Sequence, residues 1–572
     1  MSMPALTFAP LDWAVIAAYF VVNTAICIWA ALAREKDTTD YFLASRSAGW
    51  FLIGSSIFAS NIGAEHLVGL AGSGAASGMA FAHWEMHSYL CIVLGWFFAP
   101  FYLRAGIFTT PEFLEKRYSP MTRTFLSGIF LVSYILTKAS VTIFAGAFAI
   151  QTVLGYQTIA LPILGEVNFF WFSAIALVAI TGIFTVVGGM KSVLWTEAMH
   201  VPVLLAGSLV LVFVGLSQIG GLEGLREANA DTIHMWRPLS TTPETQGFPG
   251  FLFDPSQTPW LGVMLASPIL GLWYWCTDQY IVQRVLTGKN LKEARRGTLF
   301  AGYLKLLPVF IFLVPGMIAV ALWKQGAAGF EGIGENPQSA FPILVSHLLP
   351  EGLRGLVLAG MLAALMSSLA SLFNSTATLF TVDFYKRLRP NVSEKHLVFV
   401  GRVATLAVVV LGMAWIPFLE ELGKGSLYGY LQLVQSLLAP SIAAVFMLGV
   451  FSKHATPASG LAGLTVGFIL GMTRLGLVIA DEHGVDFPMA LDTFIAINWL
   501  YFAFFLFVFT CLVIFTVSLV TAKTPDAQLA GLTRDTVTEA QRAEVKASYT
   551  GWDVFHSLVI LAIIAGVYIY FW

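Results

Sequence analysis

The feature that most constrains this fold is the succession of apolar segments long enough to cross a lipid bilayer. A helix of about 20 residues spans the ~30 Å hydrocarbon layer. Charged residues make up only 11% of the 572-residue chain, against roughly 25% in soluble domains. The sequence therefore predicts an all-α, multi-pass protein of the cell (plasma or bacterial inner) membrane, surrounded by the lipid bilayer.

Fourteen transmembrane helices are predicted. Most of the 31 Lys and Arg residues fall in the loops that follow odd-numbered helices, and the positive-inside rule assigns such loops to the cytoplasm. Both termini are therefore expected outside. The predicted helices cover residues 12–33, 48–72, 76–103, 124–154, 167–188, 194–218, 259–283, 298–323, 353–385, 398–418, 428–450, 456–480, 492–522 and 552–571.

Composition argues against several other classes of protein. The chain has no basic face outside short loops, which excludes a nucleic-acid partner. Its four cysteines all lie inside apolar segments, so neither a disulfide framework nor a metal-binding pair is expected. No catalytic residues and no obligatory protein partner are predicted. Residues 534–546, with alternating charges, are expected to form a short solvated helix without a partner.

Residues 56–69 form a small, polar stretch inside an apolar segment, with Ser60, Asn61, Gly63, Glu65 and His66 at mid-depth. Polar groups at that depth must face protein, water or ligand. Two interpretations are open: the stretch joins helices through hydrogen bonds, or it is unwound so that free carbonyls hold a cation. The glycine and the two titratable groups favour the second.

A second interruption is expected five helices later, at Pro268 and Gly271. Helices separated by an odd number run in opposite directions through the membrane. Broken helices at corresponding positions of two inverted halves indicate a transporter whose substrate binds near the midplane.

Several charged side chains are predicted inside the membrane. Inserting each one costs about 2.5 to 3.5 kcal/mol of free energy, so each is expected to have a structural or functional role. Glu85 and Lys305 are predicted near the middles of their helices. They form either a simple ion pair or, with His66 and Gln432, the wall of a pocket for a polyhydroxylated solute. Sugars need such mixed donors and acceptors, because each unpaired hydroxyl in a buried site costs ~1 to 3 kcal/mol. Other charged residues and histidines predicted inside the membrane include Glu65, Lys138, Glu197, Asp278, His83, His87 and His200.

The ninth predicted helix carries Ser367, Ser368 and Ser371 within five residues. Such hydroxyls usually bond to carbonyls of the preceding turn, so alone they indicate little. Opposite the unwound carbonyls of Ala59 and Ile62, however, they would complete a cage of neutral oxygens. Such a cage suits sodium, whereas Ca²⁺ and Mg²⁺ call for carboxylates.

Several motifs together resemble the sodium:solute symporter family, and within it the sodium/glucose cotransporter-like branch. The motifs are Ser60-Asn61-Ile62-Gly63, residues 69–78, residues 273–279, residues 302–306 and residues 366–369. The resemblance implies a LeuT-type five-plus-five inverted-repeat core within one transmembrane transporter domain, residues 1–572. Residues 48–480 would form this core, 12–33 an extra N-terminal helix and 492–572 additional C-terminal helices.

The resemblance also implies functional residues. Sodium would be held by the carbonyls of Ala59, Ile62 and Ala364 and the hydroxyls of Ser367 and Ser368. Tyr274 would also act as the inner gate, beneath an outer lid of Leu70, Trp84 and Tyr428. The sugar site would comprise Asn61, His66, Glu85, Ser88, Tyr274, Trp275, Lys305 and Gln432.

Two departures from the family pattern bear on a second cation site. Relatives carry Asp where this chain has Glu197, and two-sodium members carry Thr where it has Ala370. Both weaken a second site built from Glu197, Ser368 and Ser371, so one sodium ion per sugar is predicted. Glu197 could instead be a neutral carboxylic acid bonded to Thr196 or His200, or a proton-coupling group.

The predicted function is sodium-coupled import of a glucose- or galactose-like hexose by alternating access. Alternatives within the family are symport of inositol, sialic acid, an amino acid or a carboxylate. A carboxylate substrate would favour an Arg or a free helix N-terminus in the pocket, where Glu85 is expected instead. A sodium-independent uniporter, a leak channel and a transporter-like sensor also remain open.

Overall fold

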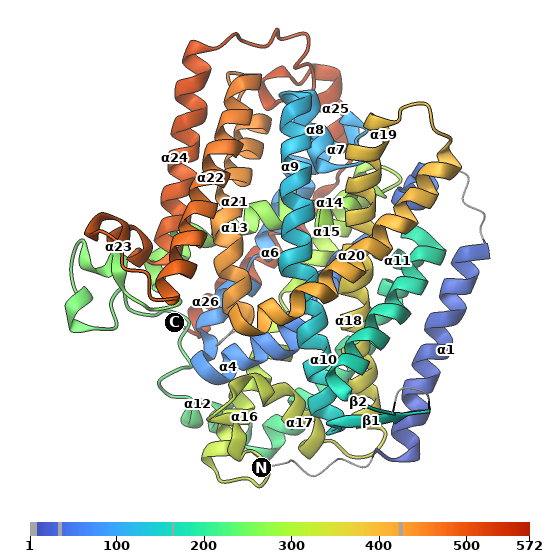
Figure 1. The fold of residues 1–572 in the computed structure, drawn as a ribbon, viewed down its shortest axis with the longest axis vertical. Coiled ribbons are helices and arrows are strands. Elements are labelled where there is room, and N and C mark those ends of the chain that lie inside the picture. Colours follow the sequence, from blue (N-terminus) through green and yellow to red (C-terminus); the bar gives the residue numbers. More distant parts are fainter. Residues whose placement is uncertain (1–7, 33–36, 163–164, 423–426) are drawn as a thin grey trace.

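The structure is a computed structural model that describes residues 8–32, 37–162, 165–422 and 427–572. Figure 1 shows a bundle of helices with one short β-hairpin at its edge. Twelve helices in the described residues are long and apolar enough to cross a membrane. They establish the multi-pass, all-α architecture that the sequence predicts.

The first part of the chain, up to the β-hairpin, contains ten α-helices and two strands in its described residues. Their bounds are Pro10–Leu32 (α1), Thr38–Leu43 (α2), Trp50–Asn61 (α3), Ala71–Ser77 (α4), Ala82–Glu85 (α5), Ser88–Val93 (α6), Ala99–Ala105 (α7), Thr110–Arg117 (α8), Pro120–Ser133 (α9), Ser140–Leu154 (α10), Thr158–Leu161 (β1) and Gly165–Asn168 (β2).

The rest of the chain is helical, and π-helical segments continue several of its helices. The bounds are Phe169–Gln218 (α11), Gly221–Ala228 (α12), Trp260–Gly271 (α13), Gln279–Leu286 (α14), Leu291–Lys305 (α15), Val314–Lys324 (α16), Ala340–Leu348 (α17), Leu353–Thr378 (α18), Lys386–Leu388 (α19), Glu394–Leu422 (α20), Leu427–Phe451 (α21), Pro457–Glu482 (α22), Met489–Ala496 (α23), Trp499–Val520 (α24), Glu539–Ala547 (α25) and Gly551–Tyr570 (α26).

The predicted count of fourteen differs from these twelve candidates for two local reasons. The 50-residue α11 is about 75 Å long at 1.5 Å per residue, more than twice the hydrocarbon thickness. Its backbone breaks at Gly189 (φ 52°, ψ −157°), so α11 covers both the fifth and the sixth predicted helix. The short α3 is not itself a candidate span. The second and third predicted helices therefore correspond to a single candidate span, Glu65–Ala105.

The first predicted interruption lies where expected. α3 ends at Asn61, and Ile62 takes an extended conformation (φ −89°, ψ 115°) before a π-helical segment, Glu65–Leu70. The carbonyl of Phe58 still accepts the N–H of Ile62 (3.1 Å), but the carbonyls after it lack following helical amides as partners.

The second interruption lies beyond its predicted position. The chain stays helical through Pro268 and Gly271, passes into a π-helical segment, Leu272–Thr277, and breaks at Asp278 (φ −69°, ψ 127°). The prediction was wrong because it took proline for the break. The break instead falls where the carboxylate of Asp278 accepts the backbone N–H of Tyr280 (3.1 Å) and caps α14.

The glycine-rich stretch 69–78 allows two helices to approach closely. A Cβ atom at Gly74 would lie 2.2 Å from the carbonyl oxygen of Leu313, and one at Gly316 would lie 1.9 Å from that of Ala71. Helices α4 and α16 therefore pack backbone to backbone, as small residues permit in membrane proteins.

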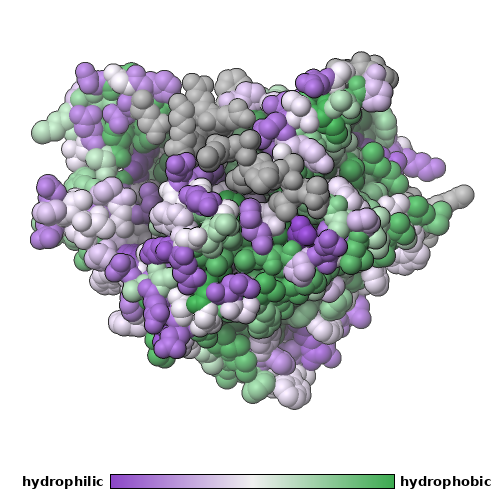
Figure 2. All heavy atoms as spheres, turned by 90° about the horizontal axis from the view of Figure 1, so that it is seen from below, coloured by the Kyte–Doolittle hydropathy of each residue, from purple (hydrophilic) through white to green (hydrophobic). Residues whose placement is uncertain are grey.

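Different helices lie at the two ends of the bundle. α1 begins and α26 ends in the lower half of Figure 1, whereas α7, α19 and α25 gather at the upper end. Figure 2 shows hydrophilic side chains spread over the lower end, with apolar patches between them. Which end faces outward stays a prediction from the distribution of Lys and Arg.

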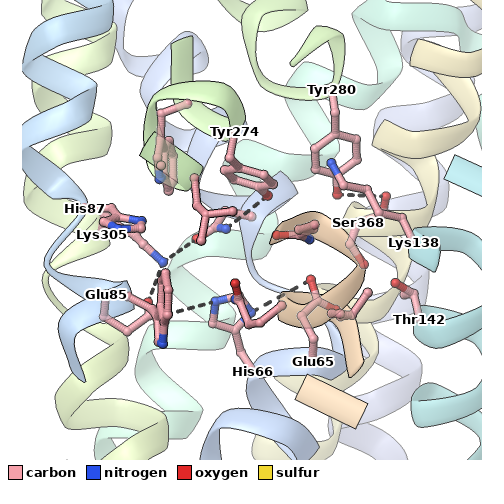
Figure 3. A pocket seen from close by; sticks show the side chains of 18 of the residues that line it. Glu65, His66, Glu85, His87, Lys138, Thr142, Tyr274, Tyr280, Lys305 and Ser368 are labelled. Atoms are coloured by element: carbon pink, nitrogen blue, oxygen red, sulfur yellow. Dashed lines mark hydrogen bonds and ion pairs between the residues drawn. The ribbon is translucent and has the colours of Figure 1, made fainter. Parts of the chain in front are cut away.

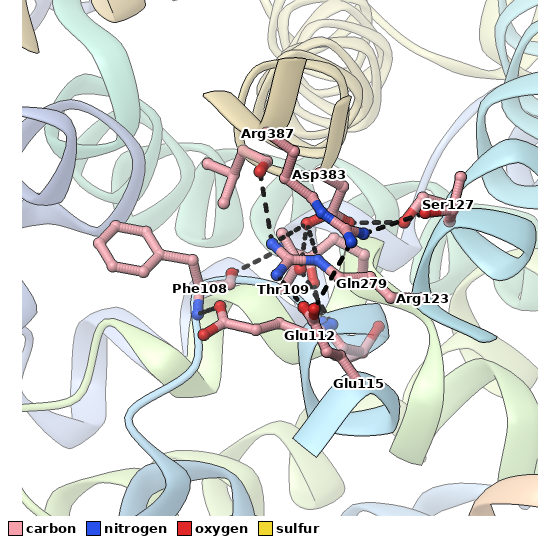
Figure 4. Close-up of polar contacts among 12 residues, drawn as sticks. Phe108, Thr109, Glu112, Glu115, Arg123, Ser127, Gln279, Asp383 and Arg387 are labelled. Carbon is pink, nitrogen blue, oxygen red and sulfur yellow. Dashed lines mark hydrogen bonds and ion pairs between the residues drawn. The ribbon is translucent and has the colours of Figure 1, made fainter. Parts of the chain in front are cut away.

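A buried ionic cluster ties three elements together at the upper end (Figure 4). Asp383, 1% exposed, accepts hydrogen bonds from Arg123 of α9, Ser127 of α9 and Thr109 just before α8 (2.6 to 2.9 Å). Arg123 also pairs with Glu115 of α8 (2.5 Å). The carboxylate is thus fully partnered, as a buried charge must be.

Candidate functional site

A polar cavity lies where the two interrupted helices meet (Figure 3). Its walls come from the breaks after α3 and α13 and from α5, α10, α15, α18 and α21. The lining residues are Asn61, Glu65, His66, Trp84, Glu85, His87, Lys138, Thr142, Leu270, Gly271, Tyr274, Trp275, Tyr280, Lys305, Ser368, Leu372, Leu431, Gln432 and Gln435.

A chain of hydrogen bonds crosses this cavity. Lys305 donates to Glu85 (2.5 Å) and to the side-chain carbonyl of Asn61 (2.9 Å). The amide nitrogen of Asn61 donates in turn to the hydroxyl of Tyr274 (3.1 Å). The predicted Glu85–Lys305 ion pair therefore exists, and both residues line the cavity. That the cavity holds a polyhydroxylated solute stays a prediction.

His66 stands between two carboxylates. Its Nε2 lies 3.6 Å from Glu85 and its Nδ1 lies 3.9 Å from Glu65. Figure 3 shows Lys305 and Glu85 on one side of the ring, with Glu65 and Ser368 on the other. His66 thus joins the polar wall near α15 to the wall near α18.

The structure brings most of the predicted sugar-site residues to one cavity. Gln432 lines it from α21, and Trp275, 2% exposed, holds its ring 5.4 Å from the Lys305 ammonium. Ser88 is the exception: its hydroxyl donates to the backbone carbonyl of Gly302, and it is absent from the lining. Ser88 joins α6 to α15 instead.

The predicted gate residues lie in different settings. Trp84 lines the cavity and stacks on Trp499 of α24, with ring centroids 5.7 Å apart. Leu70 is fully buried in the π-helical segment before α4 and does not reach the lining. Tyr274 lines the cavity, while the side chain of Tyr428 lies outside the described residues.

Most of the predicted sodium-site atoms converge between the end of α3 and the middle of α18. The hydroxyl of Ser367 donates to the carbonyls of Ala59 (2.8 Å) and Ala364 (2.9 Å). Ser368 donates to the carbonyl of Leu365 (3.1 Å), and its oxygen would lie 2.8 Å from a Cβ atom at Gly63. Its hydroxyl therefore stands beside the extended backbone that begins at Ile62.

Glu197 contacts Ser371, as the predicted second site requires, but not the neighbours on its own helix. Its carboxylate accepts hydrogen bonds from Ser56 and Ser60 of α3 and Ser371 of α18. The expected bonds to neighbours on its own helix are absent: Thr196 donates to backbone carbonyls of Ser192 and Val193, and His200 bonds Tyr19 and Asn23 of α1. That expectation was wrong because Glu197 points toward α3 and α18.

Sequence reasoning gave no role to a cation on the α10 side of the cavity. Lys138 pairs with Asp278 (2.6 Å) at the second break, and its ammonium lies 4.7 Å from the ring of Tyr274 and 4.1 Å from that of Tyr280. Tyr280 donates to the carbonyls of Ser60 (2.5 Å) and Ser368 (3.2 Å). The sequence showed only that Lys138 and Asp278 are charged residues inside the membrane. It did not show that they pair across helices.

Comparison with known proteins places the chain in a family. Residues 41–467 match the model of the sodium:solute symporter family. The chain belongs to this family. Sodium/glucose cotransporter 4 of Danio rerio is 38% identical over 551 residues, which cover 92% of this chain and 81% of that protein. Sodium/glucose cotransporter 1 of Sus scrofa is 38% identical over 543 residues, covering 91% and 80%.

A solved structure supports the fold of this symporter family member. The substrate-bound, outward-open structure of a Na⁺-coupled sialic acid symporter superposes with a TM-score of 0.72 at 20% identity, covering 91% of this chain and all of that one. This likeness shows a shared LeuT-type transporter fold. The fold accounts for a cavity placed between two broken helices.

Proposed function

We propose that the protein is a sodium-coupled symporter that imports a hexose such as glucose or galactose. The observation that carries the proposal is the cavity between the two breaks, in a chain 38% identical to proteins named sodium/glucose cotransporters. The cavity presents a carboxylate, an ammonium, amides and imidazoles within reach of one another. Hydroxyl groups of a sugar need this mixture, because each can donate and accept.

The same lining favours a sugar over a carboxylate substrate. Both cations in it, Lys138 and Lys305, are already paired with Asp278 and Glu85. The Glu65 carboxylate, one of whose oxygens has no hydrogen-bond partner among the described residues, would repel an anion. Tyr274 and Trp275 add aromatic surface on which the C–H faces of a sugar ring pack.

The residues take the following proposed roles. Sodium binds the carbonyls of Ala59, Ile62 and Ala364 and the hydroxyls of Ser367 and Ser368, and so holds the break after α3 against α18. The sugar then binds beside it, Trp84 closes the outer side, and Tyr274 moves to release the sugar inward. Ser88 is left out of the sugar contacts, since its hydroxyl is occupied by Gly302.

One sodium ion supplies enough free energy for nutrient uptake. A membrane potential of 100 mV contributes ~2.3 kcal/mol per charge, and a tenfold sodium gradient adds ~1.4 kcal/mol. Together they support accumulation of a neutral sugar by roughly 500-fold.

The test is uptake into proteoliposomes that contain the purified chain. Labelled glucose and galactose are offered with an inward sodium gradient, with an inward potassium gradient of equal ionic strength, and against unlabelled hexoses, inositol, sialic acid and amino acids. We expect sodium-dependent accumulation that hexoses inhibit. Equal uptake in both gradients would indicate a uniporter, and inhibition by inositol, sialic acid or amino acids alone would refute a hexose cargo.

A further inference from the structure

The loop that precedes α26 folds against the upper end of the bundle and closes a groove there. Figure 1 shows α25 near α7, and residues of both helices line the groove. The guanidinium of Arg104, in the last turn of α7, donates to the carbonyl of Gly531 (3.3 Å), and Leu529 in the loop is fully buried. The short helix that the charge pattern predicts for residues 534–546 is confirmed over its second part by α25, while Arg534–Thr536 form a separate 3-10 turn.

The groove has a volume of about 580 Å³ and two walls. The wall from α7, the segment before it and the end of α21 carries Trp96, Phe97 and Phe451, with Arg104 on the same helix. The facing wall, from the loop and α25, carries Arg534 and Arg542 with one acid, Asp535, in the lining. Glu544 of α25 attracts Arg104, and the lining itself holds three arginines to one acid.

The arginines have unused hydrogen-bonding capacity. Arg534 and Arg542 are exposed and form no ion pair with any described residue. The Nε of Arg104 is buried without a partner among the described residues. Guanidinium groups in this state suit phosphate, which they bind bidentately.

The groove sits at the level of the membrane surface. Arg104 and Phe451 stand at or beside the ends of two candidate spans, Glu65–Ala105 and Leu431–Phe451. Phe97, one to two turns below Arg104, is 52% exposed, as a side chain that faces lipid would be. By the positive-inside rule this end is cytoplasmic, the leaflet in which basic pockets recognise anionic head groups.

We propose that this groove binds one anionic phospholipid of the inner leaflet, with its phosphate on the three arginines and an acyl chain along Phe97 and Phe451. The charge pattern alone predicted no partner for residues 534–546. The tertiary structure changes that inference because it places two of their arginines opposite Arg104 and an aromatic wall. This proposal does not depend on the transported substrate.

The test is lipid binding to the purified full-length chain by intact-complex mass spectrometry. Dioleoyl phosphatidylglycerol and dioleoyl phosphatidylcholine, which share acyl chains, are titrated onto delipidated protein. We expect one phosphatidylglycerol to bind at least about tenfold more tightly than phosphatidylcholine, since several arginines each contribute roughly a fivefold factor near an anionic surface. Equal affinities would overturn the proposal.

Two variants assign the binding to the groove. Arg534→Ala with Arg542→Ala removes two exposed groups and is expected to weaken phosphatidylglycerol binding roughly 30-fold. The matched control, Arg389→Ala with Lys395→Ala, removes two exposed cations at the same end, one just after α19 and one in the first turn of α20, and should bind like the parent. Loss in both variants, or in neither, would refute a specific site.

A further experiment distinguishes a phospholipid from a soluble phosphate as the ligand of the groove. Phe97→Ser should weaken phosphatidylglycerol binding while leaving the arginines intact. Glycerol 3-phosphate, which has the phosphate without chains, should fail to displace the lipid at equal concentration. Displacement at equal concentration would show that the groove recognises a soluble phosphate and would overturn the lipid proposal.

Discussion

Single side chains in the cavity are expected to carry measurable shares of sugar affinity. Gln432→Ala and Glu85→Gln each remove one hydrogen-bonding function from the lining. Losing one such pairing should weaken sugar binding by about 1 to 3 kcal/mol, that is ~5-fold to ~150-fold. The glutamine variant is preferred at Glu85 because its amide oxygen can still accept a hydrogen bond from Lys305, whereas alanine offers no acceptor.

Sugar affinity at saturating sodium is the measurement for both variants. Ser88→Ala is the matched control, since its hydroxyl belongs to a helix contact outside the cavity and its loss should leave sugar affinity unchanged. Parent-like affinity in both Gln432→Ala and Glu85→Gln would remove the cavity as the sugar site.

The proposed sodium site makes a separate prediction. Ser368→Ala should raise the sodium concentration for half-maximal uptake by ~5-fold or more, since it deletes one oxygen ligand. Sugar affinity at very high sodium should change far less. Sodium and sugar favour the same conformation, so weaker sodium binding lowers the apparent sugar affinity only until sodium saturates its site.

The control for this substitution lies on the same helix. Thr376→Val removes a hydroxyl that donates only to the carbonyl of Leu372, one turn earlier. Its sodium dependence should match the parent. If Ser368→Ala also responded to sodium like the parent, the cation would have to bind elsewhere.

The sequence predicts which side chains lie inside the membrane from their type and spacing. It does not predict which of them face the cavity, because that depends on contacts between helices. Asn61 and Glu85 were predicted at mid-membrane because polar groups there are costly, and both line the cavity. Ser88 has the same character, yet only the approach of Gly302 decides where its hydroxyl points. The partners of Glu197 likewise lie on two other helices, which no pattern within α11 specifies.

Helix breaks were predictable to the extent that they depend on local backbone chemistry. Gly63 amid polar residues marks the first break correctly, since such residues lower the cost of leaving the helix. Proline and glycine near Pro268 gave the wrong position for the second. There the decisive features are the cap formed by Asp278 and its pairing with Lys138 across the bundle, which depend on tertiary structure.

At the level of elements, the ionic cluster around Asp383 should stabilise the upper end of the bundle. Arg123→Ala leaves this carboxylate buried without its cation, a change that costs about 3 to 5 kcal/mol in comparable buried pairs. Thermal unfolding in detergent should show a clearly lowered Tm.

The paired variant separates electrostatics from packing. Arg123→Met combined with Asp383→Leu removes both charges and keeps apolar volume, so its Tm should recover toward that of the parent. A double variant as unstable as Arg123→Ala would mean that the guanidinium acts through other contacts, such as the one with Glu115.

At the level of the whole molecule, the open quantity is the number of charges moved per sugar. Three serine hydroxyls surround Glu197, two from α3 and one from α18. This arrangement satisfies the carboxyl group without a cation, which supports one sodium ion per sugar. It also brings the oxygen atoms of four side chains together in one place, so a second cation site and a proton-coupled role remain testable alternatives.

Reversal potentials of proteoliposomes under defined sodium and sugar gradients measure that ratio, and Glu197→Gln distinguishes the three roles. If the carboxyl is only structural, parent and variant both move one charge per sugar at every pH, because the amide keeps an acceptor for the serines. A second sodium site requires two charges per sugar in the parent and fewer in the variant. Uptake that persists without sodium under an inward proton gradient, and disappears in Glu197→Gln, would establish proton coupling. We expect one charge per sugar in both proteins, and a measured ratio of two sodium ions per sugar in the parent would contradict this stoichiometry.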